Sequence, residues 1–89
     1  MNKGMDTDQV RTFGNNLQNN LRGQVESLLQ QITSTTQGLN WIGPDADRFK
    51  GERLGELTSK FQQLMTSMQD IGLIAVRNAD EQDTAAAAL

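Results

Sequence analysis

A single break, at residues 38–44, separates two long stretches of helical periodicity in this chain of 89 residues. Gly38 and Asn40 favour the end of one helix, because both residue types tolerate the left-handed conformation found at helix C-termini. Pro44 suits the first turn of the next helix, where its missing N–H would have no intrahelical partner. The one Trp and the one Pro of the chain both lie here. The pattern predicts two long helices joined by a short turn that carries Trp41.

The stretch before the break has the period of an amphipathic helix. Its apolar residues recur at steps of three or four, which argues against a strand. The opposite face is rich in Asn and Gln and almost uncharged. Asp6, Thr7 or Asp8 can cap the start, and we expect this helix at about residues 7–38, followed by the turn at 39–43. The apolar stripe consists of Val10, Phe13, Leu17, Leu21, Val25, Leu28, Ile32 and Leu39.

The stretch after the break carries a wider apolar arc. From Leu54 to Ala75 the spacing is close to that of a coiled-coil seam, and at about 100° per residue the arc reaches roughly 200°. One neighbouring helix covers a narrower seam than that. We expect this helix at about residues 44–80, with a flexible tail at 81–89.

These patterns predict an all-α fold in which the whole chain, residues 1–89, is one domain. The connection is short, so the two helices must be antiparallel. The excess apolar arc needs a second contact surface, which predicts that two hairpins dimerise into a four-helix bundle. The residues expected to form the mid-hairpin core and part of the dimer interface are Leu17, Leu21, Val25, Leu28, Leu57, Phe61, Leu64 and Met68.

Glycines inside the predicted helices need a reason, because glycine weakens a helix by about 1 kcal/mol relative to Ala. Gly14 falls on the apolar face, so close approach by another helix and tolerated imperfection are equally good interpretations there. Gly23 points away from that face, which favours the interpretation that it is a tolerated imperfection of the helix. Gly51 and Gly55 lie one turn apart, and their spacing allows tight packing near the turn.

Composition argues against several classes of function. The chain has no Cys and no His, and its Ser residues have no triad partners, so we predict neither an enzyme, nor a cofactor site, nor a metal site. A formal charge of -3 disfavours nucleic acid as a partner. No apolar run approaches the ~20 residues of a membrane span. The N-terminus has no apolar h-region typical of a signal peptide, so conventional rules predict a cytoplasmic location.

Trp41 has two compatible interpretations. Its ring can close the end of the hairpin by packing on Leu39, Ile42 and Phe49. It can also form an exposed hydrophobic site that a partner protein recognises, since tryptophan is enriched at the hot spots of protein interfaces.

At Trp41-Ile42-Gly43 the chain resembles the WXG family, the early-secreted-antigen-like proteins of type VII secretion systems. The resemblance covers essentially the whole length: the chain length, two amphipathic stretches and a central Trp-X-Gly turn. It implies a helical hairpin that dimerises with itself or with a paired relative. It also implies export by a membrane-embedded ATPase without a cleaved signal peptide, from the cytoplasm to the outside of the cell.

The resemblance further implies a two-part export signal. Trp41 and Gly43 match the first part. The second part is a C-terminal Tyr-X-X-X-Asp/Glu element, often presented beside the partner's Trp, and this chain has no Tyr. The nearest alignment places Val76 at the Tyr position and Asp80 at the acidic position. Either the signal is degenerate here, or a partner with an intact signal carries this subunit out.

Three functions remain open from the sequence. The first is a non-enzymatic secreted protein or adaptor of type VII export. The second is a targeting or chaperone subunit bound to a larger toxin or effector. The third is a cytoplasmic structural helical bundle unrelated to secretion.

Overall fold

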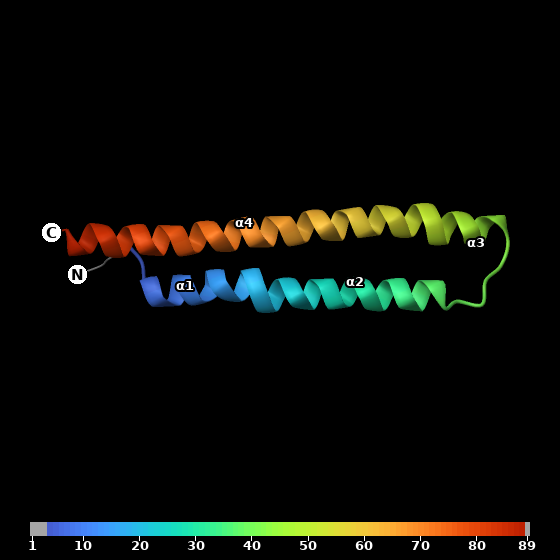
Figure 1. Ribbon diagram of the computed structural model, residues 1–89, viewed down its shortest axis with the longest axis horizontal. Coiled ribbons are helices and arrows are strands. Elements are labelled where there is room, and N and C mark those ends of the chain that lie inside the picture. Colours follow the sequence, from blue (N-terminus) through green and yellow to red (C-terminus); the bar gives the residue numbers. More distant parts are fainter. Residues whose placement is uncertain (1–3, 89) are drawn as a thin grey trace.

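The computed structural model describes residues 4–88, which form two long antiparallel helical arms joined at one end (Figure 1). The first arm consists of α1 (Thr7–Asn16), a π-helical turn η1 (Leu17–Leu21) and α2 (Arg22–Gln37). The second arm consists of α3 (Pro44–Arg48), a π-helical turn η2 (Phe49–Arg53) and α4 (Leu54–Ala87). The predicted all-α hairpin is therefore confirmed.

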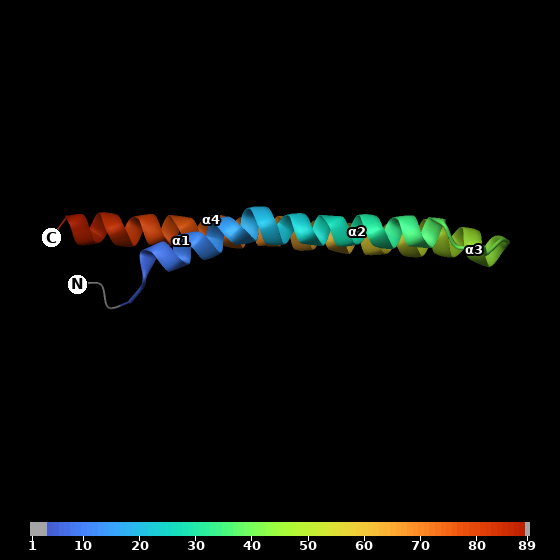
Figure 2. The same ribbon diagram turned by 90° about the horizontal axis from the view of Figure 1, so that it is seen from below.

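The hairpin is long and thin. Its principal extents are 69 × 16 × 15 Å and its radius of gyration is 19.7 Å, whereas a compact domain of this length has a radius of gyration of about 12 Å. The accessible surface is 6488 Å², roughly 1,300 Å² more than a folded monomer of this mass usually exposes. The second view shows the arms overlying one another along most of their length, with α1 bending away near the N-terminal end (Figure 2).

Both arms begin as their sequences predict. Asp6 caps α1 by accepting a hydrogen bond from the backbone N–H of Gln9 at 3.0 Å, so one of the three candidate caps is confirmed. The second arm begins at Pro44, and the Asp47 N–H donates to the Gly43 carbonyl at 2.9 Å. The proline needs no intrahelical acceptor at this position.

The arms come into close backbone contact where Gly14 of α1 meets Gly72 of α4. A Cβ atom on Gly72 would lie 2.5 Å from the Gly14 carbonyl oxygen, and a Cβ on Gly14 would lie 2.6 Å from the Gly72 carbonyl oxygen. Both glycines are buried. The close-approach interpretation of Gly14 is thus confirmed, and only two residues without side chains permit this backbone contact.

The π-helical turn η1 follows this crossing directly. A π turn widens the helix by one residue and disturbs the regular hydrogen-bond ladder, so nearby carbonyls need other donors. Side chains supply them: Asn19 donates to the Asn15 carbonyl at 2.8 Å, and Arg22 Nε donates to the Gln18 carbonyl at 2.8 Å. The Asn-rich sequence at this point therefore satisfies the backbone of an irregular turn.

The interior of the hairpin is small. Among the described residues, the buried apolar side chains are Ala46, Leu54 and Ala79. Six of the eight predicted core residues are half-buried, while Leu28 and Leu64 are each 48% exposed. In the single chain Leu28 and Leu64 are therefore not core residues, because the two arms meet along one narrow line. Their place in a dimer interface remains a prediction.

Two expectations need correction. The second helix does not end near residue 80: α4 continues to Ala87, so residues 81–87 of the expected flexible tail are helical, and Leu89 lies outside the described residues. Ion pairs from the first arm and the helical propensity of alanine explain this extension. Gly51 and Gly55 do not permit tight packing within the chain, since a Cβ atom at either would meet nothing within 4 Å. Gly23 is equally open, as expected.

The crossing can be tested with Gly72→Ala, because a Cβ atom there has no space. Overpacking of this kind costs about 1–3 kcal/mol, so we expect a lower midpoint in urea unfolding followed by circular dichroism. Gly55→Ala is the matched control in the same helix and should stabilise the protein by about 1 kcal/mol, from helix propensity alone. Equal effects of the two substitutions would show that the arms do not touch at Gly72.

Candidate functional site

The turn between the arms carries an apolar tip patch, defined as Leu39, Trp41, Ile42 and Phe49. The Trp41 and Phe49 rings lie 5.4 Å apart between centroids at an interplanar angle of 52°, which is a favourable tilted contact. Trp41 nevertheless remains 40% exposed, and Ile42 is 89% exposed. Trp41 thus both packs against the second arm and presents part of its ring to solvent.

Hydrogen bonds fix the path of the turn below this patch. The Leu39 carbonyl accepts from the Trp41 N–H at 2.9 Å and from Lys50 Nζ at 3.1 Å. Lys50 lies in η2, so the second arm holds the end of the first arm by this contact. The ammonium also offsets the negative end of the α2 dipole.

Gly43 has a conformational role in the motif. Its φ is 122° and its ψ is 176°, and it is the one residue with positive φ within the described range 4–88. An L side chain in this region is strained. The Trp-X-Gly pattern therefore combines a partly exposed ring with a backbone bend that needs glycine.

The opposite end of the hairpin carries a polar cluster that we call the Arg11 clasp, made by Arg11, Asp8, Asp80 and Asp83. Arg11 Nη2 lies 3.0 Å from Asp80 Oδ1 and 2.7 Å from Asp83 Oδ2, and Nη1 lies 3.3 Å from Asp8 Oδ1. Arg11 Nε also donates to Asp80 at 3.1 Å. The clasp joins the start of α1 to the last turns of α4.

The clasp perturbs the charges of its members. The Thr7 hydroxyl and the Arg11 guanidinium donate hydrogen bonds to Asp83, and these lower the pKa of Asp83 below its ordinary value. The Arg11 pKa is raised by its hydrogen bonds to Asp83 and Asp80. Both shifts favour the charged forms and hence the ion pair.

The four residues expected to serve recognition lie at both ends of the molecule. Trp41 and Gly43 occupy the turn, while Val76 and Asp80 lie far along α4, near the opposite end. A single chain therefore does not bring the two halves of the expected signal together. Within the chain Val76 lies against Gly14, where an added Cβ would be 2.8 Å from Val76 Cγ2, and Asp80 is paired with Arg11.

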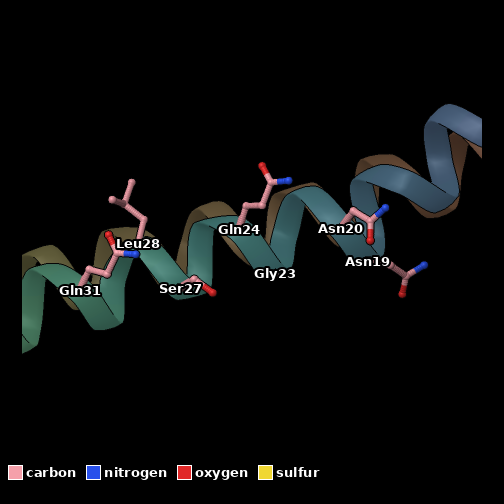
Figure 3. A pocket seen from close by; sticks show the side chains of 7 residues that line it. All are labelled: Asn19, Asn20, Gly23, Gln24, Ser27, Leu28 and Gln31. Carbon is pink, nitrogen blue, oxygen red and sulfur yellow. The ribbon is translucent and has the colours of Figure 1, made fainter.

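A depression along the outer face of η1 and α2 is open and not enclosed. The side chains that line it project from the first arm into solvent without converging on a common point (Figure 3). In the part of the chain that the structure describes, no group of acidic residues is arranged to hold a metal ion, and no helix there has the length and apolar character to cross a membrane. The depression is lined by Asn19, Asn20, Gly23, Gln24, Ser27, Leu28 and Gln31.

Several residues at these two ends are not identifiable from the sequence. Lys50 and Arg11 lie on polar faces of the predicted helices and Asp83 lies in the expected tail, and a charged side chain in such places is usually just solvated. Their roles depend on which residues of the other arm lie opposite. The role of Gly72 could have been predicted, since it lies on the apolar face of its helix as Gly14 does.

Comparison with known proteins adds no assignment: the chain matches no model of a protein family, no curated protein and no solved structure.

The lowered pKa of Asp83 predicts how the clasp responds to acid. A carboxyl whose folded pKa is lowered contributes stability above its unfolded pKa and loses it as the pH falls through the folded value. The ordinary pKa of this carboxyl is 3.8. We therefore expect the last turns of α4 to detach from α1 only when the pH falls below 3.8. Carbon-detected NMR titration of the Asp83 carboxyl measures this, and a midpoint at or above 3.8 would contradict the clasp.

The backbone at Gly43 predicts that Gly43→Ala destabilises the turn. Strain of this kind costs of order 1–3 kcal/mol, and we expect a lower thermal midpoint together with a changed Trp41 fluorescence. Gly23→Ala is the control, because that position is helical and open. A Gly43→Ala protein as stable as the parent would mean that the turn does not need glycine.

Proposed function

We propose that this chain is a non-enzymatic secreted protein or adaptor of the WXG type, exported through a type VII secretion system as a dimer of helical hairpins. The partner is a second copy or a paired relative of the same fold. The proposal combines the resemblance of the Trp-X-Gly turn with the surfaces that the hairpin leaves uncovered.

The apolar surface of the hairpin is the observation that carries the proposal. Leu64, Ile71 and Ile74 are about half exposed, and their spacing of seven and three places them along one side of α4. Leu28 and Phe13 add exposed apolar area on the first arm. A chain that folds alone rarely leaves its largest apolar residues so open, whereas a second hairpin would cover such a stripe.

The amount of surface is also in the range that association requires. A standard interface buries about 800 Å² on each partner. A rod 69 Å long offers that area along one side. If a second hairpin covered these exposed apolar residues, they would add to the small buried interior of the single hairpin.

The separation of Trp41 from Val76 and Asp80 fits the same proposal. If two hairpins pack antiparallel, the tip patch of each lies near the far end of the other. The two halves of the expected signal then meet across the dimer, although they are apart within one chain. Because this chain has no Tyr, Asp80 is the part of the C-terminal element that it supplies itself, whether the partner is a second copy or a paired relative.

The tip patch provides the test. Trp41→Ala and Ile42→Ser should leave the helical circular dichroism largely intact, because the arms pack elsewhere, and should reduce export from the native host at least tenfold if the patch is a recognition hot spot. Export is measured by immunoblot of culture supernatant against cell lysate, with a cytosolic marker for lysis.

Asn40→Ala is the matched control, since Asn40 is an exposed polar residue of the same turn. Export of the parent protein should also stop when the secretion ATPase is deleted. Supernatant levels that are independent of both the tip patch and the ATPase would contradict the proposed function.

A further inference from the structure

The Arg11 clasp joins segments that are 69 residues or more apart in the sequence. Arg11 offers three nitrogen atoms to three carboxylates, and the shortest contact, at 2.7 Å, goes to Asp83. The Arg11 side chain is 29% exposed, whereas the Asp80 and Asp83 side chains are more than half exposed. The cation is therefore enclosed by carboxylates that themselves face water.

Among residues 4–88, Arg11 is the basic residue that pairs with the carboxylates at this end of the hairpin. Arg11 is the sole basic residue of α1. The neighbouring carboxylates repel one another without it. Arg77, on α4, is exposed, and no ion pair of Arg77 is present within residues 4–88. Around the clasp lie the further acidic groups Asp6 and Glu81.

Little apolar contact supports the clasp. Beyond the Gly14–Gly72 crossing, the one buried residue in the last turns of α4 is Ala79, a small side chain that contributes little burial. Most other residues between 77 and 88 are exposed. Charged contacts between exposed groups are weak and are screened by salt. The charged part of the attachment between α1 and the end of α4 can therefore be replaced by a competing charge.

We infer that the Arg11 clasp is an autoinhibitory contact, which keeps residues 77–87 on the first arm and occupies Asp80 until a partner with a basic surface takes over the carboxylates. The inference rests on the proposed function, in which Val76 and Asp80 belong to the segment that the export apparatus reads. Opening the clasp leaves the Gly14–Gly72 crossing in place, so the hairpin persists while its acidic end is released.

The physical half of the inference is tested by hydrogen exchange on the purified full-length chain. Arg11→Gln and Asp83→Asn should each raise the exchange rates of amides 80–87 about tenfold, because local opening governs exchange at helix ends. Arg53→Gln is the matched control: it makes the same charge change but breaks only a local pair with Glu56 on its own arm. Unchanged exchange in both clasp variants would overturn the inference.

The functional half is tested by export of the same variants from the native host. Arg11→Gln and Asp83→Asn should increase the secreted fraction severalfold, because they free Asp80 without removing it. Asp80→Asn also opens the clasp but removes the recognised carboxylate, so its export should fall. This opposite sign distinguishes inhibition from simple loosening of the helix end.

The outcomes separate the two proposals. If Arg11→Gln and Asp83→Asn exchange faster but are exported no better than the parent, the autoinhibitory role is wrong and the proposed function stands. If no variant, including the parent, is exported in a host with an active secretion ATPase, the proposed function is wrong and the autoinhibitory role falls with it.

Discussion

Two helices packed side by side can bury only one stripe of each, and the whole structure follows from that limit. The stripes of this chain are wider than the line along which the arms meet, so half-exposed apolar residues remain on both arms. Further helices, such as those of a second hairpin, would cover these residues. The proposed function depends on what covers them.

Within the hairpin, contacts at three places determine the relative position of the arms. The Gly14–Gly72 crossing brings the backbones together, the Lys50–Leu39 hydrogen bond holds the turn, and the Arg11 clasp holds the termini. The three contacts differ in kind, because the first depends on shape, the second on one hydrogen bond and the third on charge. Salt and acid weaken the clasp, because it is the contact of the three that depends on charge.

The sequence predicted the features that depend on local chemistry and periodicity. The two arms, the cap at Asp6, the start at Pro44 and the close approach at Gly14 all follow from residue type and spacing. Periodicity and residue type do not predict features that depend on which residues of the two arms lie opposite one another. The continuation of α4 to Ala87 requires Arg11 opposite its end, and the π turns at Leu17–Leu21 and Phe49–Arg53 have no periodic signal.

The candidate site divides in the same way. Trp41 and Gly43 were identifiable because a lone Trp two residues before a glycine in a helix break is a local pattern, and the φ of 122° at Gly43 explains the need for glycine. The role of Asp80 was not identifiable, since its pairing with Arg11 depends on the register between distant segments.

The central claim is that the hairpin completes its interior by association, and the most direct measurement is molar mass by light scattering across a dilution series, with helical circular dichroism recorded on the same samples. If the partner is a second copy, we expect an assembly of at least two 9.8 kDa chains whose helical signal falls as it dissociates. If the partner is a paired relative, we expect an isolated chain with a weak helical signal. A 9.8 kDa monomer that remains fully helical at every concentration would contradict both.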